Sequence, residues 1–221
     1  MALRERATHA LARQLGHPRG PFGRLVGRVL NRRNAAAVQA AVSAVPVRAG
    51  DVLADIGFGG GLGLELLLRR LDDVDRRSGR VHGVDVSETM LAAASRRFRR
   101  HETAGRLQLH LAPMEALPLG DSTVDAAITL NTIYFLPDLQ AAFREVHRVL
   151  RPGGRLVVGL GDPDDMARMA VTREGFRIRP VGAVIEALGA AGLVVVEHRR
   201  VGEGEDAVHL LVATAEPGDV S

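Results

Sequence analysis

The sequence predicts an α/β fold: a seven-stranded, mainly parallel sheet with helices on both faces, a C-terminal antiparallel hairpin and an N-terminal helical extension. Three observations support this prediction. Short apolar runs alternate with helical patterns, which favours strands joined by crossover helices. Two β-rich runs near the C-terminus are separated only by the turn residues GEGED, which favours a hairpin. The 221 residues suffice for one such domain with a sizeable core.

Each strand is predicted from a short apolar or alternating run, and these runs occupy residues 52–57, 80–86, 106–112, 124–132, 155–161, 194–201 and 207–215. Helical patterns fill the intervals at residues 62–71, 88–100, 138–150 and 181–191. Ser87 and Asp138 stand where helix N-caps are expected, and Gly192 stands where a helix ends. The sequence RPGG predicts a turn into the fifth strand.

The chain shows no internal repeat and no linker. We expect residues 1–44 to form a helical extension or lid, residues 45–215 to form the ligand-binding α/β domain, and residues 216–221 to form a disordered tail. In a parallel sheet, ligands bind beyond the carboxyl ends of the strands. The segments that follow strands, at residues 55–61, 85–87, 112–115 and 131–134, are therefore the ones in which a site is expected.

The composition limits the available chemistry. The chain has no Cys, so disulfides and thiolate metal sites are excluded, and no metal site is predicted. No apolar run approaches the roughly 20 residues of a membrane span. The N-terminus lacks an apolar signal core, so we expect a cytoplasmic protein.

The basic character of the chain is local. The formal net charge is +3, yet residues 1–34 hold eight Arg and one Glu, or +7, which leaves −4 for the remainder. A basic arm can bind nucleic acid, and an amphipathic helix with solvated arginines accounts for the same pattern. With no Trp and one Tyr, there is little aromatic surface for base stacking, so we expect no nucleic-acid partner.

Five glycines fall within residues 57–63, directly after the first predicted strand. The dinucleotide pattern G-x-G-x-x-G fails because its third glycine falls on a leucine, and a P-loop needs a Lys that the chain lacks. The pattern Asp-x-Gly-x-Gly-x-Gly does fit, and it resembles motif I of the class I methyltransferases that use S-adenosylmethionine (SAM). Glycines there would let a small ligand lie on bare backbone, with N–H groups at the following helix start facing its carboxylate.

The stretch GVDVSETML, residues 83–91, is similar to the second motif of this family. The resemblance implies that Asp85 binds the ribose hydroxyls and that Met90 lies near the adenosine. LAPMEALPLGDSTVDAAITL resembles the next family stretch, with one departure. Pro113 stands where the family often has an Asp for the adenine amino group. Glu115 or nearby backbone carbonyls are the alternatives for that contact.

NTIYFLPD and RVLRPGGRLVVG complete the resemblance, which spans about residues 45–160 and continues more weakly to about residue 215. It is closest to the UbiE-like branch, which acts on quinones, sterols and natural products. The resemblance implies a Rossmann-like fold and a SAM-dependent methyltransferase (EC 2.1.1.-). It also implies that the cofactor is bound by Asp55, Gly57, Phe58, Gly59, Gly61, Asp85, Val86, Met90, Pro113, Met114, Glu115 and Asn131.

The favoured function is methyl transfer to a small-molecule acceptor. The acceptor, its reacting atom (O, C or N) and the oligomeric state stay open. Two alternatives remain: a nucleic-acid or protein methyltransferase, and a SAM-binding natural-product enzyme that does not methylate, such as a cyclase.

The reaction needs alignment more than acid catalysis, because the leaving thioether is neutral. The catalytic candidates are Tyr134, just after the fourth strand, and His17 in the N-terminal arm. Acceptor specificity is expected from residues 1–34 and 162–180. An apolar pocket there would be formed by Phe22, Met166, Met169 and Phe176.

Overall fold

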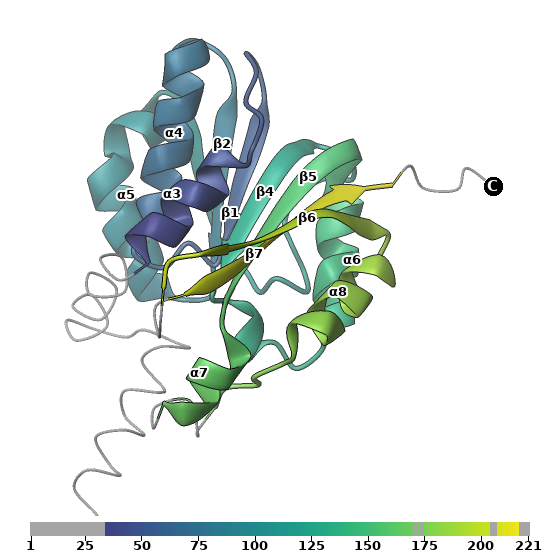
Figure 1. The fold of residues 1–221 in the computed structure, drawn as a ribbon. Coiled ribbons are helices and arrows are strands. Elements are labelled where there is room, and N and C mark those ends of the chain that lie inside the picture. Colours follow the sequence, from purple (N-terminus) through teal and green to yellow (C-terminus); the bar gives the residue numbers. More distant parts are fainter. Residues whose placement is uncertain (1–33, 170–171, 173–174, 204–206, 217–221) are drawn as a thin grey trace, which may run out of the picture.

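The computed structural model describes residues 34–169, 172, 175–203 and 207–216 (Figure 1). Most of the predicted N-terminal extension, and residues 217–221 of the predicted tail, lie outside the described residues. The boundaries predicted for the extension, the α/β domain and the tail stay predictions. Within the described part, no helix combines the length and the apolar character that crossing a membrane requires.

Seven strands form one sheet in the order β3-β2-β1-β4-β5-β7-β6. The strands are β1 (Val52–Ile56), β2 (Arg80–Asp85), β3 (Leu107–Leu111), β4 (Val124–Leu130), β5 (Leu150–Gly161), β6 (Leu193–Val201) and β7 (Val208–Ala215). Strands β1 to β5 pair in parallel, whereas β7 runs antiparallel to both β5 and β6. The predicted α/β fold with its C-terminal hairpin is confirmed.

Helices cover both faces of the sheet (Figure 1). One face carries α3 (Ala35–Ser43), α4 (Leu62–Val74) and α5 (Glu88–Thr103), and the other carries α6 (Leu139–Val149) and α8 (Val181–Gly189). A short 3-10 helix, η1 (Ile133–Phe135), follows β4, and α7 (Pro163–Arg168) follows β5. Each face has its own apolar core, so the sheet separates two hydrophobic clusters.

Helices α5 and α6 begin at the N-cap residues that the sequence predicts. Ser87 is the N-cap of α5, and its hydroxyl accepts a hydrogen bond from the Met90 N–H at 3.3 Å. Asp138 caps α6 in the same way, accepting from the Ala141 N–H at 2.9 Å. Each cap satisfies one of the backbone donors that a helix start leaves without an intrahelical partner. Both predicted N-caps are confirmed.

Two strand boundaries differ from the prediction by two or more residues. Strand β4 ends at Leu130 rather than at residue 132, because Asn131 adopts a left-handed backbone with φ of 56°. RPGG does not precede β5 as a separate turn, since β5 already begins at Leu150. The pairing with β4 shifts from Val124–Leu150 to Ala126–Arg155, so these residues form a bulge within the strand.

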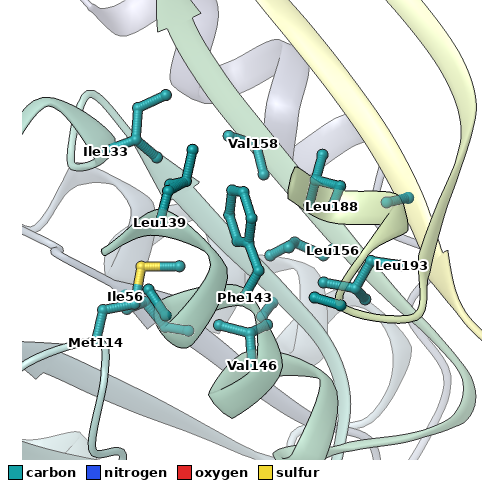
Figure 2. Packing of buried hydrophobic residues seen from close by; sticks show 14 of the residues in the cluster. Ile56, Met114, Ile133, Leu139, Phe143, Val146, Leu156, Val158, Leu188 and Leu193 are labelled. Carbon is teal, nitrogen blue, oxygen red and sulfur yellow. The ribbon is translucent and has the colours of Figure 1, made fainter. Parts of the chain in front are cut away.

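The core between the sheet and α6 is centred on Phe143. Its side chain is 0% exposed, and Figure 2 shows it among Val146, Leu156, Val158 and Leu188. These residues come from α6, β5 and α8, so this one ring joins three elements. This packing anchors α6 to the half of the sheet that carries the C-terminal hairpin.

Replacing Phe143 with Ala is expected to lower the free energy of unfolding by about 3–5 kcal/mol, because a cavity replaces a fully buried ring. Urea denaturation followed by circular dichroism measures the loss. Gln140→Ala, at an exposed position of the same helix, serves as the control and is expected to change stability by less than about 0.5 kcal/mol. Similar losses for both variants would contradict the central role of the ring.

Candidate functional site

A cavity of about 340 Å³ opens at the carboxyl ends of β1, β2 and β4. It is lined by residues from all four segments in which the sequence predicts a site. Of the twelve residues predicted to bind the cofactor, eleven line it: Asp55, Gly57, Phe58, Gly59, Asp85, Val86, Met90, Pro113, Met114, Glu115 and Asn131. Gly61 does not belong to this lining.

The loop after β1 brings bare backbone to the cavity. Gly57 has φ of 76°, its N–H donates to the Val84 carbonyl at 2.7 Å, and a Cβ at this position would collide with Thr132 Oγ1. Gly59 has φ of 49°, and a Cβ there would meet only the Gly57 carbonyl oxygen, at 3.9 Å. Gly57 is therefore required by close packing, whereas Gly59 leaves open space next to the cavity.

Gly61 serves the helix rather than the cavity. It is the N-cap of α4 with φ of 77°, and a Cβ there would lie 3.2 Å from the Phe98 ring. Because L-residues with side chains rarely adopt this backbone conformation, glycine allows the sharp turn from the loop into α4.

Asp55, the last polar residue of β1, lies beneath the start of α4. Its side chain is 4% exposed, and it accepts a hydrogen bond from the Leu64 N–H. A Cβ at Gly63 would collide with the Asp55 carboxylate, so the absence of a side chain at Gly63 leaves room for this carboxylate. Burial, reinforced by the nearby charge of Asp85, raises the pKa of Asp55 to about 8.

Asp85 ends β2 at the edge of the cavity and is 7% exposed. Its Oδ2 accepts a hydrogen bond from the Gly59 N–H at 2.8 Å, and its Oδ1 accepts from the Ser87 N–H at 2.9 Å. The carboxylate thus joins the glycine loop to the start of α5. These two bonds fix its orientation at the cavity wall.

The segment after β3 forms another wall. Met114 is 3% exposed, whereas Pro113 is exposed and Glu115 is half-buried. The Glu145 carboxylate of α6 accepts from the Leu117 N–H at 2.8 Å and holds the end of this segment. Among these lining residues, Glu115 supplies the side-chain hydrogen-bond acceptor that Pro113 lacks.

The segment after β4 closes the cavity on the side of β5. Asn131 lines the cavity, and its backbone N–H donates to the Gly159 carbonyl at 2.9 Å. Tyr134 is not part of the lining: its side chain is 3% exposed, and its hydroxyl accepts from the Gly161 N–H at 2.6 Å. Burial raises the pKa of the Tyr134 phenol, so the phenol stays protonated at neutral pH.

Thirteen lining residues were not among the predicted site residues, and they include Asn34, Val38, Thr132, Phe135 and Leu136. The last three belong to the predicted segment after β4 or follow it directly, and the 3-10 turn of η1 decides which side chains reach the cavity. Asn34 and Val38 come from the start of α3. The sequence does not identify Val38 as a site residue, because an apolar residue in a helix usually indicates packing alone.

The other predicted residues lie elsewhere. His17 and Phe22 fall outside the described residues. Met166 is 8% exposed, and Met169 is half-buried. The Phe176 ring packs on Phe135, with ring centroids 4.8 Å apart. Within the described ranges, no group of three or more His, Asp or Glu side chains is placed to hold a metal ion.

Comparison with known proteins gives the same picture. Residues 54–158 match a family model described as a methyltransferase domain. The biotin biosynthesis bifunctional protein BioHC of Teredinibacter turnerae is 32% identical over 117 residues, which are 53% of this chain and 20% of that protein. The ubiquinone/menaquinone biosynthesis C-methyltransferase UbiE of Klebsiella pneumoniae is 31% identical over 112 residues, which are 51% of this chain and 43% of that protein.

The chain thus spans well under two thirds of the length of these two curated relatives. Among solved structures, geranyl diphosphate C-methyltransferase from Streptomyces coelicolor A3(2) superposes with a TM-score of 0.71 at 19% identity, covering 90% of this chain and 83% of that one. That complex contains Mg²⁺, geranyl-S-thiolodiphosphate and S-adenosyl-L-homocysteine. At 19% sequence identity, this similarity is evidence for the fold alone.

The family match covers the part of the sheet that carries the cavity, including the glycine loop, Asp85 and Asn131. The observed strand order, with its antiparallel C-terminal hairpin, is that of the class I methyltransferase fold. Sequence match, motif order and topology therefore agree: residues 54–158 match the methyltransferase domain family, and the chain has the class I methyltransferase fold.

Proposed function

We propose that this protein transfers a methyl group from SAM to a small-molecule acceptor. The observation that supports the proposal most directly is the cavity at the ends of β1, β2 and β4, in which eleven predicted cofactor residues meet. The names of two relatives, from biotin and quinone biosynthesis, favour a small molecule over a macromolecule. The reacting atom of the acceptor stays unassigned.

The residues present fit the cofactor. A cavity of about 340 Å³ is within the size range of small-molecule sites. Gly59 leaves open space beside the cavity, so a ligand can lie against the backbone there. SAM carries a sulfonium and an ammonium group, and the described lining supplies carboxylates at Asp85 and Glu115. Within this cavity, Asp85 would hold the ribose and Glu115 would accept from the adenine.

When bound, SAM supplies a methyl carbon that takes a lone pair from the acceptor while the carbon–sulfur electron pair stays on sulfur, leaving neutral S-adenosylhomocysteine. An acceptor hydroxyl or amine then releases its proton to water. The contribution of the protein is to position both partners and to exclude water, because alignment at about 3–3.5 Å provides much of the acceleration. The glycine loop and Asp85 position the donor side, and Thr132, Phe135 and Leu136 line the acceptor side.

Production of S-adenosylhomocysteine, followed by mass spectrometry with a panel of quinols, phenols and amines, tests the proposed reaction. A methylated small molecule supports it. Methylation of RNA, DNA or protein would instead favour the macromolecular alternative, and an altered small molecule without S-adenosylhomocysteine would favour a non-methylating enzyme. Steep weakening of nucleic-acid binding with salt would identify phosphate contacts.

Gly59→Ala is expected to weaken SAM binding at least tenfold, because the added methyl group occupies the space beside the cavity. Isothermal titration calorimetry measures the affinity. Gly105→Ala is the matched control, since Gly105 also has positive φ, at 69°, with nothing within 4 Å of an added Cβ, and lies outside the cavity lining. Equal SAM affinity in both variants would show that Gly59 serves only the backbone turn.

Asp85→Asn is expected to weaken SAM binding about tenfold or more, because hydrogen bonds to a charged acceptor are stronger than those to a neutral amide. The size of the side chain is nearly unchanged, so the circular dichroism spectrum should stay the same. Asp73→Asn, at an exposed position of α4, is the control and should bind SAM like the original protein. An unchanged SAM affinity in Asp85→Asn would show that this carboxylate does not bind the cofactor.

The elevated pKa of Asp55 predicts how stability depends on pH. The folded protein keeps a proton up to about pH 8, whereas the unfolded chain releases it near the ordinary value of 3.8. The unfolded state therefore binds fewer protons in this window, and the free energy of unfolding falls as pH rises through it. Asp55→Asn removes this dependence, because the amide does not titrate.

Urea denaturation of both ligand-free proteins at several pH values measures the effect. The stability of Asp55→Asn relative to the original protein is expected to rise between pH 5 and 8, by at most roughly 1.4 kcal/mol per pH unit, and to level off above pH 8. Saturating SAM should reduce the difference, because a cationic ligand favours the ionised carboxylate. A difference in stability between the two proteins that does not change between pH 5 and 8 would contradict the raised pKa of Asp55.

A further inference from the structure

A second hollow lies between α4 and α5, which Figure 1 shows side by side on one face of the sheet. Its volume is about 510 Å³, and it shares no lining residue with the cavity at the carboxyl ends of the strands. We call it the arginine groove, because five arginines line it: Arg69 from α4, and Arg96, Arg97, Arg99 and Arg100 from α5.

The backbone of α5 is irregular where it lines the groove. Six consecutive residues, 96–101, belong to the lining, although a regular helix points consecutive side chains in all directions. Phe98, in the middle of this run, has φ of −107° and ψ of 19°, so α5 is kinked there. The kink therefore accompanies the convergence of the arginines on both sides of Phe98 on a single groove.

The carboxylates of the groove already have cationic partners. Glu65 forms ion pairs with both Arg69 and Arg97. Asp72 pairs at 3.0 Å with Arg106, which does not line the groove. Two carboxylates thus stand against five arginines, and the groove carries an excess of positive charge.

The excess charge belongs to Arg96, Arg99 and Arg100, which are all exposed. Within the described residues, no carboxylate forms an ion pair with any of these three arginines. Like charges four residues apart destabilise a helix, so Arg96 and Arg100 weaken α5 rather than support it. Helix stability therefore does not explain this cluster, whereas a bound anion would.

The residues around the groove indicate which anion fits. The planar fork of an arginine matches the oxygens of a phosphate group, and several such forks suit several phosphate charges. Asp73 and Glu102 directly follow lining residues on the two helices, so a long strand of phosphates leaving this end would meet carboxylates. The Phe98 ring is 6% exposed and offers little surface for base stacking, which disfavours a nucleic acid.

We propose that the arginine groove binds a small compound that carries several phosphate charges, such as a polyphosphate or a multiply phosphorylated metabolite. This site is separate from the cavity in which methyl transfer is proposed, and it does not depend on that function.

Arg97 connects the groove to the glycine loop. Its Nη1 donates to the Gly60 carbonyl oxygen at 3.4 Å, and Gly60 lines the cavity. An anion in the groove competes with this carbonyl for the Arg97 donors and releases the loop from this contact. The anion is therefore expected to weaken cofactor binding, and the cofactor to weaken anion binding by the same factor. This coupling, unlike the site itself, rests on the proposed function.

Calorimetry of the full chain with inorganic tripolyphosphate, and with orthophosphate at the same ionic strength, tests the site. Tripolyphosphate is expected to bind at least about tenfold more tightly than orthophosphate, because more charge-assisted hydrogen bonds form. No binding of tripolyphosphate, or equal binding of the two anions, would overturn the proposal. So would dodecathymidylate if it bound more tightly than tripolyphosphate, since the groove would then take a nucleic acid.

Variants locate the bound anion. Arg96→Ala and Arg100→Ala are each expected to weaken tripolyphosphate binding about tenfold, because each removes charge-assisted donors. Arg144→Ala is the control, since it removes the same charge from an exposed position of α6, on the other face of the sheet. Thermal melting should show no loss of stability in Arg96→Ala or Arg100→Ala. Equal tripolyphosphate affinity in Arg100→Ala and Arg144→Ala would show that the anion does not bind in the groove.

The coupling is measured with S-adenosylhomocysteine, whose zero net charge prevents direct pairing with the anion in solution. Saturating tripolyphosphate is expected to weaken its binding several-fold in the original protein and in Arg144→Ala. An unchanged affinity would overturn the connection through Arg97, while the anion site would stand. A protein that binds tripolyphosphate but no S-adenosylhomocysteine would contradict the proposed function and leave the anion site supported.

Discussion

One hydrogen bond joins two walls of the cavity: the Gly59 N–H donates to the Asp85 carboxylate at 2.8 Å. It connects the loop after β1 to the end of β2 across 26 residues of sequence. The same carboxylate accepts from Ser87, whose hydroxyl caps α5. The shape of the glycine loop and the start of the next helix thus depend on a single buried charge, and that charge also acts on Asp55.

Much of the fold could be predicted because its signals are local. Alternation of apolar runs with helical patterns identified the strands, and the side chains of Ser87 and Asp138 marked two helix starts before any tertiary contact was known. Eleven of the twelve residues that the motifs predict to bind the cofactor line one cavity. Residues that end parallel strands converge by topology, so a sequence that predicts the strands also predicts where these residues meet.

The remaining features depend on contacts between distant segments. The left-handed backbone of Asn131 is held by β5, so the apolar run through residue 132 gave no sign that β4 ends early. Tyr134 is adjacent to the cavity in sequence, yet η1 turns its ring into the core and brings Phe135 and Leu136 to the lining instead. The RPGG bulge likewise exists only through its pairing with β4. Residue type alone therefore does not predict the end of β4, the burial of the Tyr134 ring or the bulge in β5.

The position of α3 has a practical consequence for handling the protein. Asn34 and Val38 line the cavity, so α3 begins at the cavity rim. Strand β7 begins beside Gly161, at the same edge of the sheet, and runs antiparallel, so its last residue, Ala215, lies opposite the amino end of β5 (Figure 1). A fluorophore attached at Ala215 would therefore lie at the edge of the sheet away from the cavity, whereas one attached at Asn34 would lie in the cavity lining.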